Sequence, residues 1–388
     1  MCVKMDVVKN ERSDIMVYLD YSATTPVDKE VMDSFIAACS YIGNPNSLHR
    51  LGVEACELIN ECTSQIRKLL NLNDEEIIYT SGASESNNLA IKGLCLKYPN
   101  RGKHIITTPL EHSSIYGPIN FLVDHGYSVD FVKLDSNGLV DLDNLKELIN
   151  DDTVLVSINA VNSEIGLRQP IEEIGKLLNN YPKITFHADL TQAIGKIEVD
   201  TSDVDMFSFS AHKFFGIKGI GCLVKKKNLI IEPLIHGGKS TTNYRSGTPT
   251  TQLIVSLAKA LRLVMDNKDK LDYISKLNSY LKEKLSKYDK VFINSNDYSV
   301  PHVLNMSVIG VKPETMLHAL ESDDIFISTQ SACSANTSVS KAVMALTNDS
   351  KRASSSIRVS LSYKTTKEEL DIFLDSFDKH YKKLTNLR

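Results

Sequence analysis

No run of apolar residues in this chain reaches the roughly 18 to 20 that a helix needs to cross a bilayer, which excludes an integral membrane protein. Basic residues form no block, and the net charge of -4 over 388 residues predicts no surface for nucleic acid or membrane. The first fifteen residues lack the apolar core of a secretory signal and the Arg-rich, acid-free face of a transit peptide. We therefore expect a cytoplasmic protein that acts on a small molecule.

The seven cysteines include no C-x-x-C pair, so we expect no zinc, iron–sulfur or thioredoxin-type site and no bound metal. Their odd number and their scatter argue against a disulfide framework. Most lie in apolar or helical contexts, where a thiol behaves as a small hydrophobic group. Cys333 differs, because it lies within STQSACSANTSVS (328–340), a small and polar segment that is typical of a loop.

Short β-branched runs alternate with helical patterns from about residue 75 onward, which predicts an α/β fold with a mostly parallel, buried, seven-stranded sheet. The expected strands are 76–80, 104–108, 129–134, 154–159, 184–188, 206–210 and 222–224. After residue 265 a charged helical stretch leads to strands near 303–308, 325–328 and 357–361, which predicts a smaller α+β domain. We expect an N-terminal extension (1–16), a large domain (17–265) and a small domain (266–388) that carries the Cys333 segment.

Two capping boxes predict helix starts. Thr25 to Asp28 places a proline at the expected first position of a helix, and Thr366 with Glu369 precedes an amphipathic stripe that ends near Leu384. We interpret that stripe as core packing.

Lys213 follows an apolar strand in MFSFSAHKFFG. A single lysine is ordinarily a solvated charge, but Phe209, Phe214 and Phe215 favour desolvation, which lowers the pKa of an amine and suits it to Schiff-base chemistry. Asp189 ends another predicted strand, so both side chains are expected where parallel strands bind ligands. Pyridoxal phosphate (PLP) needs such a lysine and an acid beside its pyridine nitrogen. Taken alone, Asp189 is equally well a helix cap.

The segment YTSGASESN (79–87) runs from a predicted strand through small residues into a helix. Such a turn directs backbone N–H groups toward an anion, so it predicts a phosphate cradle that Ser210, His212 and Thr248 could complete. Similar turns are common without any ligand, which makes this segment weak evidence by itself.

Eleven motifs follow one another along the chain: LDYSATTP, GNPNSLHRLG, TSGASESN, EH, VNSEIG, HADLTQ, SFSAHK, HGG, RSGT, SAC and SIRVS. In this order they resemble the cysteine desulfurases, which are class V, fold type I PLP enzymes. The resemblance extends from about Tyr18 to the end of the chain.

The resemblance implies a role for each matching residue. Lys213 would form the Schiff base, Asp189 would pair with the pyridine nitrogen and Gln192 would bind the phenolic oxygen. His112 would stack on the ring and assist proton transfer. The remaining implied cofactor contacts are Ala83, Ser84, Ser210, His212 and Asn162 within one subunit and Thr248 from the partner subunit, so a homodimer is expected.

The substrate implied is L-cysteine, with its carboxylate on Asn162 and Arg358, because a guanidinium offers two parallel charge-assisted hydrogen bonds. Cys333 would attack the substrate sulfur as a thiolate, release L-alanine and keep the sulfur as a persulfide. A protein acceptor, either an iron–sulfur scaffold or a tRNA-thiolation protein, would then take it. No direct contact with nucleic acid is expected.

The sequence departs from the family at Gln330, at 239–242 after HGG and at 362–364 after SIRVS. These changes spare the cofactor set and indicate a diverged subgroup. Three alternatives stay open: an aminotransferase or lyase in which Cys333 is incidental, a selenocysteine lyase, and an inactive scaffold. The SAC segment argues against the first, and nothing in the sequence separates the second. Joint retention of Lys213, Asp189, His112 and Cys333 argues against the third.

Overall fold

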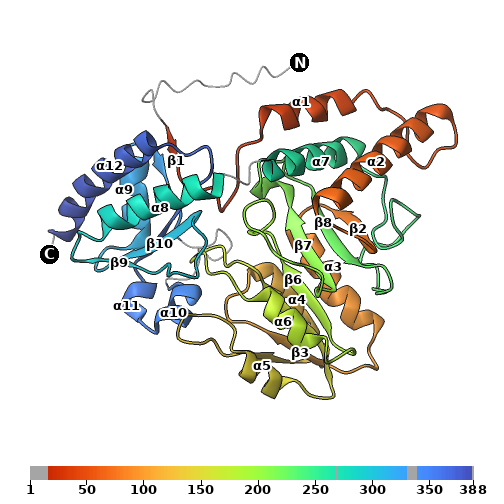
Figure 1. Cartoon of the computed structure of the whole chain (residues 1–388), viewed down its shortest axis with the longest axis horizontal. Helices are drawn as coiled ribbons and strands as arrows, with labels where there is room; N and C mark the ends of the chain where they lie inside the picture. Colours follow the sequence, from red (N-terminus) through yellow and green to blue (C-terminus); the bar gives the residue numbers. More distant parts are fainter. Residues whose placement is uncertain (1–15, 267–269, 330–338, 387–388) are drawn as a thin grey trace.

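The computed structural model describes residues 16–266, 270–329 and 339–386. A seven-stranded central sheet has the strand order β2-β8-β7-β6-β5-β3-β4, and a three-stranded small sheet has the order β12-β10-β9. Figure 1 shows the small sheet with α8, α9 and α12 on the left, and the central sheet with α1, α2 and α7 on the right. Among the described helices, none has the length and apolar character that crossing a membrane requires.

The central sheet is parallel from β7 to β4, and only β8 runs antiparallel to its neighbours. Its strands are β2 (Glu75–Thr80), β3 (His104–Thr107), β4 (Ser128–Phe131), β5 (Thr153–Asn159), β6 (Thr185–Asp189), β7 (Met206–Ser210) and β8 (Gly221–Lys226). Every residue of β5, β6 and β7 is buried, because helices cover both faces of the sheet. The predicted seven-stranded, mostly parallel sheet is confirmed.

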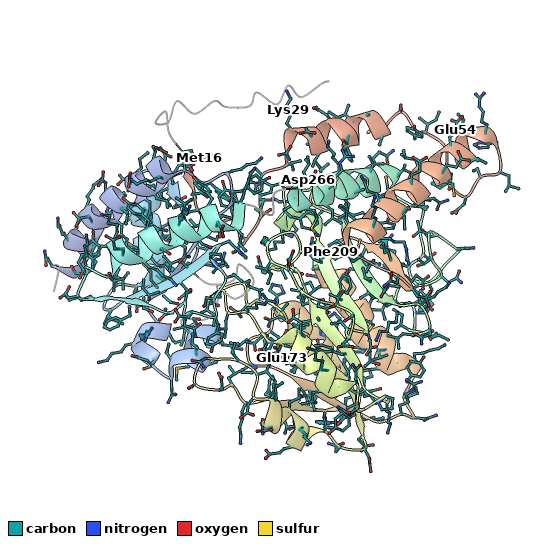
Figure 2. All side chains as sticks on the ribbon, viewed as in Figure 1. Met16, Lys29, Glu54, Glu173, Phe209 and Asp266 are labelled. Carbon is teal, nitrogen blue, oxygen red and sulfur yellow. The ribbon has the colours of Figure 1, made fainter. Side chains whose placement is uncertain are left out.

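Alternate residues of each strand pack on opposite layers of helices. Ile78, Ile105 and Met206 pack with α3 and α4, whereas Ile77, Ile106 and Phe207 pack with α2, α6 and α7. Phe209 lies fully buried on β7 near the middle of the sheet (Figure 2). The helices of this part are α1 (Lys29–Ala38), α2 (Arg50–Leu69), α3 (Ala83–Lys97), α4 (Ser113–Val123), α5 (Leu142–Leu148), α6 (Ile171–Leu178) and α7 (Thr251–Met265).

A second hydrophobic core lies between the small sheet and its helices. The elements of this part of the chain are α8 (Leu271–Leu285), β9 (Val291–Ile293), β10 (Val303–Val308), α9 (Pro313–Glu321), β11 (Ile325–Phe326), α10 (Lys341–Thr347), α11 (Ser350–Ala353), β12 (Ser356–Ser360) and α12 (Lys367–Thr385). Helices α10 and α11 pack in a separate cluster with Leu110, Ile165 and Leu167. Strand β1 (Val17–Tyr18) pairs with β11, so Val17 and Leu19 join this second core. The described chain thus begins beside the small sheet and crosses to the central sheet at residues 20–28.

One capping prediction is confirmed and one is wrong. Thr366 and Glu369 form the expected capping box of α12. The helix predicted at Thr25 begins instead at Lys29, with Asp28 as its N-cap. The hydroxyl of Thr25 is engaged elsewhere: it donates to the carbonyl of His212 at 3.0 Å and accepts from the amide of Phe215 at 2.6 Å. These tertiary bonds tie the 20–28 segment to the loop after β7.

Candidate active site

The carboxyl ends of β5, β6 and β7 lie side by side and carry the central acid of the site. Asp189 pairs in register with Asn159 on one side and Ser208 on the other. Its Oδ2 accepts from Nδ2 of Asn87 at 2.9 Å and its Oδ1 accepts from the amide of Thr191 at 2.9 Å. Because the side chain of Asp189 is buried and accepts two hydrogen bonds, it is held in one orientation at the sheet edge.

Lys213 ends a short 3-10 turn (Ala211–Lys213) that directly follows β7. Its amine donates to the carbonyl oxygens of Ser22 and Ala23 at 2.7 and 2.8 Å. The amide of Gln192 donates to the same Ser22 oxygen at 2.8 Å. The 20–28 segment therefore brings two predicted site residues together, although they come from different strand ends.

His112 is the N-cap of α4, and its ring is held by that helix. Its Nδ1 accepts from the amide of Ser114 at 3.1 Å and lies 2.8 Å from the hydroxyl of the same residue. Burial lowers the pKa of His112; the carboxylate of Asp189 opposes this effect and the amine of Lys213 adds to it. Since Nδ1 accepts the backbone hydrogen, the neutral ring carries its proton on Nε2.

Glu111, the neighbour of His112, is a buried carboxyl group that sequence reasoning left without a role. Burial raises its pKa to about 8; bonds from the hydroxyl of Thr108 (2.6 Å) and the amide of Asn159 (3.0 Å) counteract this, and the charge of Asp189 reinforces it. Glu111 is therefore largely protonated at neutral pH.

The predicted phosphate cradle is built on two glycines. Gly82 precedes α3 with a φ of 154°, and no side chain caps the N–H groups of Ala83 and Ser84 in the first turn. A Cβ on Gly221 would come within 2.7 Å of the Cα of Gly82, so only glycine lets this turn lie against β8. A Cβ at Gly82 would stand only 3.5 Å from the Ser210 hydroxyl, which places that hydroxyl at the turn.

His212 lies inside the site, whereas Thr248 lies on the surface of the chain. Nδ1 of His212 is 3.1 Å from the hydroxyl of Thr24, and burial, together with the charges of Lys213 and two other lysines, lowers its pKa to about 4. Thr248 is exposed and shares a small hollow with Ser81 and Arg245. The structure thus joins His212 to the Lys213 cluster and leaves Thr248 facing outward.

The residues predicted to bind a carboxylate lie where the two sheets meet. Arg358, only 1% exposed, forms an ion pair with Asp20 at 2.7 Å and donates to the carbonyl of Ser163 at 2.9 Å. Asn162, which precedes Ser163, donates to the carbonyl of Leu110, and its Oδ1 accepts hydrogen bonds from two backbone amides. Asn162 therefore shapes the turn against which Arg358 lies.

Cys333 lies outside the described residues, and so does Gln330. The chain nevertheless leads to them from a defined place. The backbone of Ser328 exchanges two hydrogen bonds with Arg358, of 3.1 and 2.7 Å. The described chain before the Cys333 segment is therefore held against the backbone of Arg358, the residue predicted to bind the substrate carboxylate.

These residues fit PLP. The site offers an amine on Lys213, a buried carboxylate on Asp189, an imidazole on His112 and a helix start for the phosphate. Among the described residues, the buried Oδ1 of Asn87 and Oγ1 of Thr191 have no hydrogen-bond partner, so polar atoms beside Asp189 are left for a bound group.

A family model described as "Aminotransferase class-V" matches residues 17–373. The chain belongs to this family. A curated NifS/IcsS protein homolog of Lactobacillus delbrueckii subsp. bulgaricus is 40% identical, over 96% of this chain and 100% of the relative. The cysteine desulfurase IscS of Dictyoglomus turgidum is 38% identical, over 96% of both chains. The predicted family, the dependence on PLP and the assignment to the cysteine desulfurase type of enzyme are confirmed.

Solved structures agree with these relatives. A NifS-like protein superimposes with a TM-score of 0.90 at 34% identity and covers 95% of this chain and 100% of its own. A structure described as SspA in complex with cysteine has a TM-score of 0.79 at 32% identity and covers 90% of this chain. The predicted fold type I architecture is likewise confirmed.

Sequence reasoning missed the residues that orient the site. Asn87 and Ser114 hold Asp189 and His112, the carbonyl of Ser22 joins Lys213 to Gln192, and Lys196 binds Gln192. Asn87 stands inside the quoted motif TSGASESN, so its position was visible and only its partner was not. Lys196 gave no signal, because a lysine after a glycine resembles an ordinary surface residue.

Proposed function

We propose that this chain removes the sulfur atom of L-cysteine with PLP as cofactor, releases L-alanine and keeps the sulfur as a persulfide on Cys333. One observation carries the proposal: the amine of Lys213, the carboxylate of Asp189 and the ring of His112 meet at one sheet edge, and Arg358 stands where the Cys333 segment begins. The curated relatives named cysteine desulfurase and the neighbour solved with cysteine support this substrate.

The predicted site residues have separate tasks in this proposal. When bound, PLP supplies an electron sink for reaction at the amino-acid α-carbon. Lys213 holds the cofactor and moves a proton with its amine, and Asp189 holds the pyridine nitrogen protonated. His112, neutral at physiological pH, accepts and returns a proton. Ala83, Ser84, Ser210 and His212 hold the phosphate, while Arg358 and Asn162 fix the substrate carboxylate.

The sulfur step balances with Cys333 as the attacking group. Its thiolate forms the new S–S bond while the C–S bond of the substrate breaks. The electron pair of the broken bond stays with the carbon fragment, which takes up a proton and leaves as alanine. A thiol reductant then releases the outer sulfur as sulfide in the test tube. In the cell, an iron–sulfur scaffold or a tRNA-thiolation protein in the cytoplasm would accept it.

Thr248 supports the proposal that the enzyme is a homodimer. Thr248 is an exposed residue of the single chain and lines a hollow with Ser81 and Arg245, which pairs with Glu85 at 2.9 Å. An exposed threonine there is free to reach the phosphate of a second copy. Light scattering should give twice the chain mass, and Thr248→Ala should weaken retention of PLP without changing that mass.

The reaction is tested with purified wild type and a Cys333→Ala variant, each incubated with L-cysteine and a thiol reductant. Wild type should show the visible band of bound PLP and form sulfide and alanine in equal amounts. The variant should keep the band and lose sulfide. If the variant forms sulfide as fast as wild type, Cys333 is incidental and a lyase without a persulfide carries the activity.

A further inference from the structure

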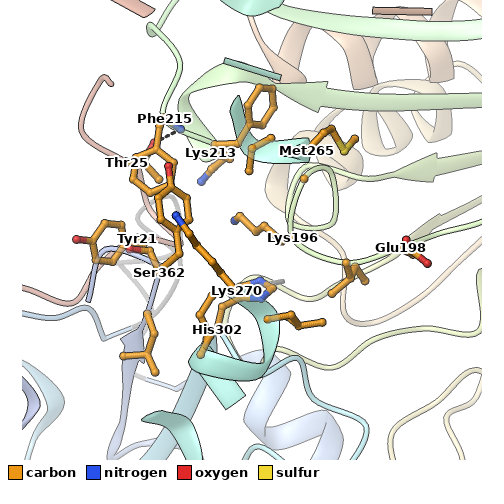
Figure 3. Close-up of a pocket in the computed structure, with 18 of the residues that line it drawn as sticks. Tyr21, Thr25, Lys196, Glu198, Lys213, Phe215, Met265, Lys270, His302 and Ser362 are labelled. Carbon is orange, nitrogen blue, oxygen red and sulfur yellow. Dashed lines mark hydrogen bonds between the residues drawn. The ribbon is translucent and has the colours of Figure 1, made fainter. Parts of the chain in front are cut away.

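Lys196 is a second lysine beside Lys213 for which the proposed reaction has no task. Both side chains line a cavity of about 350 Å³ between the end of α7, the start of α8 and the turn after β12. Figure 3 shows the two amines directed into this cavity from neighbouring positions. A partly buried amine in such a place calls for an explanation, because desolvating an ammonium is costly unless it is paired or hydrogen-bonded.

The amine of Lys196 is bonded to the side chain of Gln192. Its Nζ donates to Oε1 of Gln192 at 2.8 Å, and Nε2 of Gln192 donates to the carbonyl of Ser22 at 2.8 Å. The amine of Lys213 donates to the same carbonyl at 2.7 Å. The carbonyl of Ser22 can only accept and a protonated Lys196 can only donate, so the NH₂ group of Gln192 faces Ser22 and its amide oxygen faces Lys196.

The local fold is arranged to make this contact. The chain after β6 turns tightly, with bonds from the amides of Ile194 and Lys196 to the carbonyls of Leu190 and Ala193. Gly195 has a φ of 72°, and a Cβ there would lie 2.3 Å from a methyl carbon of Val264. Glycine at this position therefore lets the turn pack against α7 and bring Lys196 back onto Gln192.

The surroundings of Lys196 are dominated by positive charge. The titratable side chains that line the cavity with it are Tyr21, Arg168, Glu198, Lys213, Lys270, His302 and Tyr363. Burial lowers the pKa of Lys196 to about 7, and the charges of Lys213 and Arg358 add to this effect. The hydrogen bond to Gln192 offsets part of the free energy lost when the ammonium of Lys196 is desolvated.

We propose that Lys196 is a positioning residue for the PLP reaction, because its amine holds the Gln192 amide in the one orientation that presents an N–H to the phenolic oxygen of the cofactor. This inference rests on the proposed function and on the role that the resemblance implies for Gln192, a hydrogen bond to the phenolic oxygen of PLP. Without Lys196, only the bond to the carbonyl of Ser22 orients the amide, so the flipped amide, whose oxygen would repel the phenolic oxygen, becomes more populated.

The test is a pH titration of the visible band of bound PLP, recorded without substrate. Lys196→Met should raise the midpoint by about one pH unit, a roughly tenfold tighter hold on the titrating proton, because the deprotonated form loses the N–H donor. Lys270→Met is the matched control: Lys270 lines the same cavity and contacts the ring of Tyr363, and its loss should leave the midpoint unchanged.

A double-mutant cycle separates orientation from charge. Gln192→Leu should raise the midpoint as much as Lys196→Met, and the double variant should show no further rise. Additive shifts would overturn the proposal, since Lys196 would then act through its charge alone. An unchanged midpoint in Lys196→Met would overturn it as well. If Lys196→Met does not fold, Lys196→Gln serves instead, because its shorter chain also loses the contact.

The readout is independent of the proposed reaction. A wild type that binds PLP but releases no sulfide would refute the desulfurase proposal and leave the titration interpretable. With L-cysteine, Lys196→Met should lower kcat about tenfold at an unchanged KM, because Gln192 contacts the cofactor and not the substrate. A change confined to KM would contradict the positioning role.

Discussion

The central sheet and the small sheet place their predicted site residues in different ways. In the central sheet, the residues that carry chemistry stand at or just past the carboxyl ends of strands, as with Asp189 and Lys213. In the small sheet, polar residues alternate with apolar ones along whole strands. The buried polar residues of β10 and β12 are Asn305, Ser307, Ser356, Arg358 and Ser360, and the apolar ones between them are Leu304, Met306, Val308, Ile357 and Val359.

This difference assigns separate tasks to the two sheets. The apolar face of the small sheet forms the second core with α8 and α12. Its polar face binds the 162–164 turn, where Asn305 donates to the carbonyl of Glu164 and Arg358 to that of Ser163. We infer that the strand ends set the chemistry, the polar face sets the substrate, and the apolar face only stabilises the fold.

Removing Lys213 should have the largest effect on activity. Lys213→Ala deletes the amine at the end of β7, and we expect sulfide release to fall by on the order of a thousandfold or more. Lys218→Ala is the control, because Lys218 is exposed on the same loop. Steady-state assays with L-cysteine would check both variants. A residual rate within tenfold of wild type would show that the strand end does not set the chemistry.

Substitutions in the core under the apolar face of the small sheet should change the stability of the protein and not its catalytic constants. Phe377 on α12 is fully buried and contacts the rings of Tyr288 and Phe373, so Phe377→Ala should lower the free energy of unfolding by about 3 to 5 kcal/mol. Phe292→Ala, at a 44% exposed position on β9, should cost under about 1 kcal/mol. Urea unfolding measures both. If Phe377→Ala changed KM for L-cysteine in the folded enzyme, the separation of faces would fail.

Local sequence patterns predicted the strands and the strand-end residues, whereas contacts between distant segments could not be predicted. The alternation of strands and helices and the order of motifs were enough for the central sheet, for Lys213 and for Asp189, because these depend on local patterns and on what PLP requires. The partners of these residues were hidden, since they come from distant segments. Thr25 shows the limit: its local sequence favours a cap, but its hydroxyl bonds the loop at His212 and Phe215, 187 and 190 residues away.

Arg358 tests the polar face of the small sheet. Arg358→Leu removes the guanidinium and leaves Asp20 without its ion pair, so kcat/KM for L-cysteine should fall about a hundredfold, mainly through KM. Arg358→Lys should recover only part of this loss, because an ammonium cannot bind a carboxylate in a bidentate manner.

The control for this change is Arg352→Leu. Arg352 donates hydrogen bonds to Asn294 and to the carbonyl of Ile293, and it donates none to a predicted site residue within the part of the chain that the structure describes. Arg352→Leu should lower the free energy of unfolding without changing KM for L-cysteine. Equal KM values for wild type and Arg358→Leu would instead place the substrate carboxylate elsewhere.

Glu111 gives a prediction about the pH dependence of stability, and it is the sharpest test of the strand-end cluster. The unfolded chain releases this proton near the ordinary value of 4.5, whereas the folded protein holds it up to about 8. Between these values the folded state binds one proton more, so the free energy of unfolding falls as pH rises, by up to about 1.4 kcal/mol per pH unit. This contribution is complete below pH 4.5 and is lost as pH passes through 8.

Glu111→Gln should remove that slope while Oε1 keeps its bonds from Thr108 and Asn159. The comparison uses urea unfolding of wild type and variant across the same pH range, because every other ionisable group contributes equally to both curves. We expect the two curves to agree at low pH, where Glu111 is neutral like glutamine, and to separate as pH rises, with the variant the more stable protein. Parallel curves would mean that Glu111 is ionised in the folded protein, and the edge would then hold two neighbouring anions with Asp189. In that case the buried edge would carry two negative charges beside the cofactor, and burial would not control the ionisation of Glu111.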